Sequence, residues 1–149
     1  MSITDRQTSE SIHILHVDDD IDFAEMATAF VEREDDQFEI ETASSASDGL
    51  TRLADSTFDC VISDYDMPRQ NGIEFLNAVR EDYPELPFIL YTGKGSEEIA
   101  SDAISAGATD YIQKKSGTDH ISVLAKRIKT YVERTRAERQ RQQLTEAIE

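Results

Sequence analysis

Carboxylate, hydroxyl and ammonium groups follow directly after four short, largely apolar segments of the chain. These side chains, with the segments they follow, are Asp18 and Asp19 after residues 12–17, Asp64 after 58–63, Thr92 after 88–91 and Lys114 after 109–113. Segments of this length and composition are typical of buried strands. In a parallel sheet the carboxyl ends of all strands face one edge, so we expect these side chains to converge.

Such a cluster needs a cation. Carboxylates about 4 Å apart repel by roughly 4 kcal/mol at an effective dielectric constant near 20, and Lys114 alone cannot offset three of them. Mg²⁺ prefers carboxylate oxygens and water, with Mn²⁺ as an alternative. A metal here would screen the acids from an incoming phosphoryl group, and one carboxylate could then attack it as a nucleophile and form an acyl phosphate. Lys114 and Thr92 could hold the phosphoryl oxygens.

The elements that must position these groups alternate between strands and helices. Strands are predicted over residues 12–17, 38–43, 58–63, 88–91 and 109–113. Helices are predicted to begin at Ile21, Ser44 and Gly72, after Ser96, and at Thr118 or Asp119. This alternation with short loops predicts an α/β fold with a doubly wound parallel sheet. Glu39 and Glu41 alternate with apolar residues, which indicates that 38–43 is an edge strand.

Composition limits the class of protein. A chain of 149 residues is expected to form one domain, and its single cysteine, Cys60, excludes an internal disulfide and fits a reducing compartment. Residues 1–11 lack an apolar signal core, and no apolar run reaches membrane-spanning length. We therefore expect a soluble cytoplasmic protein without a membrane partner.

Charge is unevenly distributed along the chain. Residues 1–125 hold 27 of the 31 acidic residues but only 8 of the 15 basic ones. An acidic body repels phosphates, which argues against direct nucleic-acid binding. The excess of arginine over lysine, together with the many acids, indicates a salt-rich, halophilic cytoplasm.

The order and spacing of these residues resemble a response-regulator receiver domain, the phosphoacceptor module of two-component signalling. The matching features are Asp18-Asp19 after an apolar strand, Asp64-Tyr65-Asp66-Met67-Pro68 with Gly72 eight residues past Asp64, Thr92-Gly93, and Tyr111 three residues before Lys114. The resemblance covers about Ile12 to Tyr131. It implies a flavodoxin-like (βα)5 three-layer sandwich with strand order 2-1-3-4-5.

The resemblance also implies a role for each acid. Asp64 would take a phosphoryl group from the phosphohistidine of a histidine kinase or phosphotransfer protein. Asp18 and Asp19 would hold Mg²⁺, Asp19 most directly, together with Asp64 and the backbone carbonyl of Asp66. The chain would thus be a self-phosphorylating phosphoacceptor with slow autodephosphorylation, and not a dedicated enzyme.

The resemblance assigns the other groups to phosphoryl binding and signalling. Lys114 would contact the phosphoryl group, and the small Gly93 would leave room for it. Thr92 and Tyr111 would form the switch, with Thr92 drawn toward the phosphate and Tyr111 turning inward behind it.

Three positions depart from or qualify the family pattern. Lys115 replaces a proline that usually forms a cis bond after the lysine. Because a cis bond without proline costs about 3–4 kcal/mol, we expect a trans bond or a strained loop. At two positions that vary in the family, Asp66 and Lys94 could pair across the mouth of the site and control the access of water, so that Lys94→Ala would change the autodephosphorylation rate.

The ends of the chain are expected to differ from its body. Residues 1–11 are predicted to be a flexible N-terminus, residues 12–132 the receiver domain, and residues 133–149 a helical extension. The extension lacks an apolar stripe, so we expect a connector to a further module on the same polypeptide. This resembles receivers ahead of sensor domains and histidine kinases in halophilic archaea, and an open reading frame ending at Glu149 would contradict it. A homodimer is also compatible with the sequence.

The remaining buried polar groups have structural interpretations. His13 and His16 are expected to be core or edge histidines with satisfied ring nitrogens, and Cys60 a buried thiol. No histidine lies in a kinase-like helix, so the chain should accept a phosphoryl group and not donate one.

Two other functions compete with this interpretation. One is an interaction module that works without phosphorylation. The other is a haloacid-dehalogenase-type phosphatase, whose nucleophile also lies in an Asp-x-Asp motif such as Asp64-Tyr65-Asp66; that class places its acidic pair later in the chain and usually carries a cap.

Overall fold

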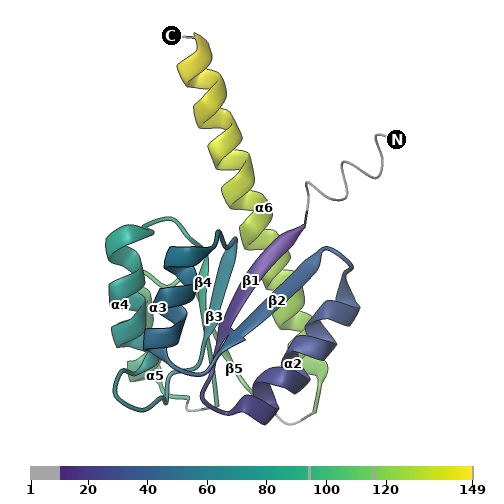
Figure 1. The fold of residues 1–149 in the computed structure, drawn as a ribbon, viewed down its shortest axis with the longest axis vertical. Helices are drawn as coiled ribbons and strands as arrows, with labels where there is room; N and C mark the ends of the chain where they lie inside the picture. The colour runs from purple at the N-terminus through teal and green to yellow at the C-terminus, as the bar shows by residue number, and fades with distance from the viewer. Residues whose placement is uncertain (1–10, 94, 116, 149) are drawn as a thin grey trace.

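The computed structural model describes residues 11–93, 95–115 and 117–148. With the labels of Figure 1, the strands are β1 (Ile12–Val17), β2 (Phe38–Ala43), β3 (Cys60–Ser63), β4 (Phe88–Thr92) and β5 (Asp110–Gln113). The helices are α2 (Ile21–Glu34), α3 (Ala46–Asp55), α4 (Gly72–Asp82), α5 (Glu97–Ser105) and α6 (Asp119–Ile148). The predicted flexible N-terminus, apart from Ser11, lies outside the described residues.

All five strands are parallel and lie in the order β2-β1-β3-β4-β5, which confirms the predicted topology and the edge position of β2. The register aligns the carboxyl ends of the strands. Val17 pairs with Ser63 across β1 and β3, and Thr92 pairs with Gln113 across β4 and β5. The predicted polar groups at the ends of β1, β3, β4 and β5 therefore all lie at the same edge of the sheet.

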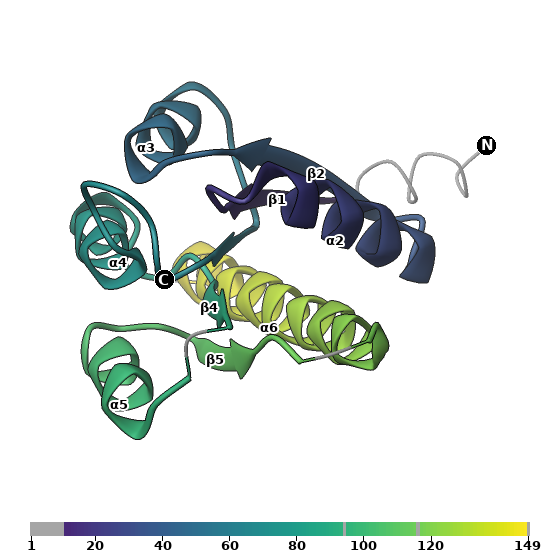
Figure 2. The same cartoon turned by 90° about the horizontal axis from the view of Figure 1, so that it is seen from below.

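The sheet forms the middle of three layers. Figure 2 shows α3, α4 and α5 along one face and α2 and α6 along the other. Each face has its own apolar core because side chains alternate along a strand. In β1, Leu15 and Val17 pack into the core under α3, α4 and α5, whereas Ile12 and Ile14 pack into the core under α2 and α6.

Helix starts follow from capping side chains. Asp20 accepts a hydrogen bond from Phe23 N at the start of α2, and Asn71 with Glu74 forms a capping box at the start of α4. The helix predicted from Ser44 begins instead at Ala46, because Ser45 is its N-cap and accepts from Asp48 N. Similarly, β3 begins at Cys60 and not at the predicted Phe58.

Helix α6 is a single helix of 30 residues. Its first half covers the sheet through buried side chains, namely Ile121, Leu124, Ala125, Ile128 and Val132. Residues 137–147 are all exposed, and Figure 1 shows this part projecting away from the body. Arg136 is the last anchor among the described contacts, with its Nη2 2.6 Å from Ser11 O and 3.3 Å from Asp59 Oδ2. In the described part of the chain, no helix has the length and apolar character needed to cross a bilayer.

Gly72 sets how closely α4 approaches β3. Its N–H donates to Tyr65 O at 2.8 Å, and a Cβ here would lie 2.2 Å from Asp64 O and 2.7 Å from Leu90 Cδ1. These two neighbours are backbone or core atoms that cannot move aside cheaply. Only glycine therefore allows the first turn of α4 to pack directly behind Asp64.

Gly72→Ala is expected to lower the free energy of unfolding by about 1–3 kcal/mol, since an added methyl group overpacks this contact. Urea denaturation would measure the change. Gly93→Ala is the matched control, because a Cβ there would meet nothing within 4 Å. Equal midpoints for the two variants would contradict the packing role of Gly72.

Candidate functional site

Three carboxylates meet at the carboxyl edge of the sheet. Asp18, Asp19 and Asp64 each offer an oxygen, and these oxygens lie within 4.8 Å of one another. Asp18 and Asp64 are buried, at 1% and 8% exposure, whereas Asp19 is exposed. The convergence predicted from strand ends is therefore present.

Lys114 lies among the acids. Its Nζ is 2.9 Å from Asp18 Oδ2 and 3.7 Å from Asp64 Oδ1. The ammonium group also lies 4.0 Å from the ring centroid of Phe23 and 5.7 Å from that of Tyr91, so aromatic faces stabilise it as well. Its backbone N–H donates to Thr92 O at 2.9 Å, which fixes the start of the following loop against β4.

The charges in the cluster do not balance. Burial raises the pKa of the Asp18 carboxyl above its ordinary value, and the nearby Asp64 carboxylate adds to this rise. The hydrogen bond and charge of Lys114 and the N–H of Asp20 oppose it without cancelling it. A set of three oxygen donors with one lysine thus fits a hard divalent cation, which would supply the missing positive charge.

The backbone around Asp64 is held firmly. Its N–H donates to Val17 O at 2.9 Å, its carbonyl accepts from Ser63 Oγ at 2.8 Å, and its Oδ1 accepts from Tyr65 N at 2.8 Å. One carboxylate oxygen is thereby oriented by the chain itself.

The two predicted switch residues lie on neighbouring strands. Thr92 is buried at the end of β4, and the register places Tyr111 of β5 beside Leu90, two residues earlier on β4. The half-buried Tyr111 packs against the core that includes Leu90. It also lines a hollow of about 580 Å³ between β5 and the first turns of α6, which Gln113 and His120 line as well.

The remaining predicted positions lie at the rim. Asp66 is exposed in the loop between β3 and α4, outside the group of three acids. Its proposed partner Lys94 lies outside the described residues. The Lys114–Lys115 bond is trans, as are all peptide bonds in the described segments, which agrees with the first of the two expected conformations.

His16 corrects the prediction of satisfied histidines. Its Nε2 is buried and has no hydrogen-bond partner among the residues described, and it lies 4.0 Å from Asp18 Oδ2. Burial lowers the pKa of His16 to about 3, with the charge of Lys114 adding to the effect, so the ring is neutral. An unpartnered buried nitrogen costs about 1–3 kcal/mol. The prediction does hold for His13, whose ring bonds Thr57 O and Glu41.

The sequence did not predict the buried contact between Tyr91 and His120. Tyr91 OH donates to His120 Nδ1 at 2.6 Å, and His120 Nε2 donates to Gly117 O at 2.9 Å. The pair joins the strand that ends in Thr92 to the first turn of α6. Its partners are 29 residues apart, and no local pattern in the sequence predicts the contact.

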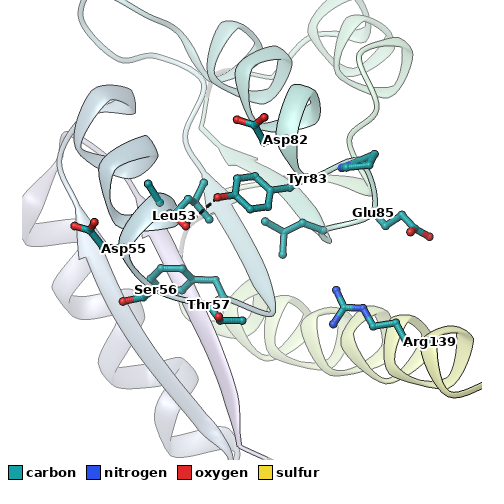
Figure 3. Close-up of a pocket in the computed structure, with 12 residues that line it drawn as sticks. Leu53, Asp55, Ser56, Thr57, Asp82, Tyr83, Glu85 and Arg139 are labelled. Carbon is teal, nitrogen blue, oxygen red and sulfur yellow. Dashed lines mark hydrogen bonds between the residues drawn. The ribbon is translucent and has the colours of Figure 1, made fainter. Parts of the chain in front are cut away.

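A separate cavity of about 480 Å³ lies before the amino ends of β3 and β4 (Figure 3). The segments 53–58 and 82–86 line it together with Arg139 of α6, and Tyr83 OH donates to Leu53 O across it. None of the clustered acids contributes, so this cavity is distinct from the candidate site.

Comparison with known proteins identifies the family. Residues 14–126 match the family model of the response regulator receiver domain, and the chain belongs to this family. A receiver domain from Methanospirillum hungatei, described as CheY-like, has a TM-score of 0.77 and 28% identity, over 86% of this chain and 98% of that one. This places the chain among receiver domains of response regulators, consistent with two-component signalling.

Curated relatives are longer than this chain. The nitrogen assimilation regulatory protein NtrX of Azorhizobium caulinodans is 30% identical over 135 residues, which cover 89% of this chain but 29% of that protein. The transcriptional regulatory protein SrrA of Staphylococcus aureus is 29% identical over 127 residues, 85% of this chain and 50% of that protein. The chain thus spans half or less of the length of these relatives.

Asp19→Asn is expected to raise the free energy of unfolding in Mg²⁺-free buffer by up to about 1 kcal/mol, because it removes one of three like charges at a solvent-facing position. The same variant should lose most of the stabilisation that millimolar Mg²⁺ gives the unaltered protein. Urea denaturation with and without Mg²⁺ measures both effects.

Asp20→Asn is the matched control. It makes the same charge change one residue further on, where asparagine caps α2 as well as aspartate does. Equal responses of the two variants to Mg²⁺ would show that the cation does not bind at the three acids.

Proposed function

We propose that this receiver domain is a phosphoacceptor that takes a phosphoryl group onto Asp64 from a histidine kinase or a phosphotransfer protein. The observation that carries the proposal is the convergence of Asp18, Asp19 and Asp64 within 4.8 Å beside the Lys114 ammonium group. Mg²⁺, or Mn²⁺ in its place, would be held by these three acids and the backbone carbonyl of Asp66.

The geometry around Asp64 supports the proposed transfer step. An oxygen of the Asp64 carboxylate attacks phosphorus, the bond from phosphorus to the donor imidazole nitrogen breaks, and its electron pair stays on that nitrogen. Lys114 Nζ, 3.7 Å from Asp64 Oδ1, needs only a small displacement to pair with a phosphoryl oxygen. A divalent cation held by the acids would neutralise the repulsion between the carboxylates and the incoming phosphoryl group.

The signal would leave the site through β4 and β5. The Thr92 hydroxyl lies on the strand end next to Asp64 and can move to bond the phosphoryl group. Tyr111 packs beside that strand and would turn further inward as Thr92 moves. A buried threonine and a half-buried tyrosine on paired strands support this coupling.

Phosphotransfer is testable by intact mass spectrometry. Incubation with acetyl phosphate and Mg²⁺ should add one phosphoryl group, and chelation of Mg²⁺ should prevent it. Asp64→Asn should abolish the gain, whereas Asp66→Asn, the matched control two residues on, should keep it.

Intact mass together with an aryl phosphate assay separates the competing functions. An unmodified Asp64 in a folded protein would support an interaction module that works without phosphorylation. Rapid turnover of an aryl phosphate would support the phosphatase. The position of the acidic pair ahead of Asp64 and the membership in the receiver family favour the phosphoacceptor over the phosphatase.

The extension of α6 supports a further proposal about architecture. Residues 133–149 would connect the receiver to an output module on the same polypeptide, since the described part of this segment is helical and mostly exposed. The cytoplasmic location, the salt-rich environment and a homodimer stay predictions from composition and sequence.

Truncation after Val132 tests the domain boundary. If the extension only connects, removal should change the free energy of unfolding by less than about 1 kcal/mol, because the anchor it removes is the partly exposed ion pair of Arg136 with Asp59 and a bond to Ser11. Arg136→Ala in the full chain is the control for that anchor. A loss of several kcal/mol on truncation beyond the effect of Arg136→Ala would make the extension part of the receiver itself.

A further inference from the structure

His16 places a ring nitrogen beside the acid cluster without a bond to it. The side chain is 2% exposed and follows Ile12 and Ile14 on the α2 and α6 side of β1. Its Nε2 is buried and unpartnered among the described residues, although it lies 4.0 Å from Asp18 Oδ2. Buried polar atoms nearly always have a partner, so an orphan next to a functional site needs an explanation.

Two donors compete for one oxygen. Lys114 Nζ occupies Asp18 Oδ2 at 2.9 Å, and His16 Nε2 is about 1 Å too far from the same atom to bond it. The other oxygen, Oδ1, already accepts from Asp20 N at 2.9 Å. In this arrangement the lysine is bonded to Asp18 and the histidine is not.

Phosphorylation would remove the lysine from that oxygen. A phosphoryl group on Asp64 carries several negative oxygens and attracts the Lys114 ammonium group more strongly than one carboxylate does. Asp18, whose side chain is wholly buried, would then lose a charge-assisted hydrogen bond. A carboxylate oxygen has more than one lone pair, so it can accept a new donor while it also contacts a cation.

We propose that His16 is a positioning residue: its Nε2–H takes over the hydrogen bond to Asp18 Oδ2 when Lys114 turns toward a phosphoryl group. This role rests on the proposed phosphorylation of Asp64. The exchange moves no proton and forms no covalent bond. It satisfies the orphan nitrogen and keeps the Asp18 carboxylate oriented in the phosphorylated state.

The imidazole ring itself reports the exchange. In the ¹⁵N-labelled unaltered protein, long-range ¹⁵N–¹H spectra would follow His16 in three states: metal-free, with Mg²⁺, and with Mg²⁺ and beryllium fluoride as a phosphoryl analogue. Since Nε2 is buried in every state, we expect a solvent-protected Nε2–H proton throughout, with a downfield shift of this proton and a shift of Nε2 only in the third state, when the bond to Asp18 forms. A ring unchanged by beryllium fluoride, or fully changed by Mg²⁺ alone, would overturn the proposal.

Variants test whether the bond matters for binding. His16→Leu removes the donor and is expected to raise the half-saturating concentration of beryllium fluoride by about tenfold, the equivalent of one hydrogen bond to a charged group. His16→Gln keeps an N–H at similar reach and should recover most of the affinity. His13→Gln, on the same strand but bonded to Thr57 and Glu41, should leave it unchanged. Equal affinities for His16→Leu and the unaltered protein would contradict the role.

Failure of this inference is distinguishable from failure of the proposed function. If acetyl phosphate and beryllium fluoride do not modify the unaltered protein at Asp64, both are wrong. If Asp64 is modified while the His16 ring and the His16→Leu affinity stay as they were, only the role of His16 is wrong. Because the spectra use the unaltered chain, their outcome does not depend on whether a variant folds.

Discussion

One lysine ammonium group faces three carboxylates at the carboxyl edge of the sheet, and the rest of the structure makes this unbalanced arrangement tolerable. Lys114 bonds Asp18 and lies close to Asp64, and the aromatic rings of Phe23 and Tyr91 also contact its ammonium group. One more cation would relieve this imbalance, as the proposed binding of a metal and then of a phosphoryl group requires. A site whose charges already balanced would bind neither a further cation nor an anionic group strongly.

The sheet holds the three carboxylates close together despite their mutual repulsion. Parallel pairing fixes the ends of β1, β3, β4 and β5 at one edge, and each face of the sheet is sealed by a separate apolar core. Behind Asp64, the missing side chain of Gly72 lets α4 pack directly against the backbone of Asp64. Repelling groups therefore stay close because their backbones cannot separate.

Local patterns in the sequence predicted most of this arrangement. Asp20, Asn71 and Ser96 cap helices through contacts within three residues, so the sequence carries their signal directly. The convergence of the acids was predicted from the common direction of parallel strands. Helix α3 and strand β3 begin two residues later than predicted, because boundaries depend on which of several polar residues caps a helix and on how far a strand pairs with its neighbours.

Contacts between distant residues were beyond the sequence. Whether His16 Nε2 bonds Asp18 depends on a distance between two side chains. That distance exceeds a hydrogen-bond length by only about 1 Å, which a sequence pattern cannot predict. The bond from Tyr91 to His120 joins two positions that carry no shared motif. For the Lys114–Lys115 bond, the energy of a cis peptide without proline left two possibilities, a trans bond or a strained loop. Only the structure shows that the bond is trans.

The single helix α6 has a consequence for anything carried at its end. Each residue of an α-helix turns the chain by about 100° and advances it by about 1.5 Å. The number of helical residues past Val132 therefore sets both the orientation and the distance of whatever follows the helix. Deleting one residue from the projecting part would rotate any domain that follows by more than a quarter turn. Deleting seven would nearly restore its orientation and only bring it closer to the receiver. In such a helix, length also sets orientation, and it can change without altering the cluster around Asp64.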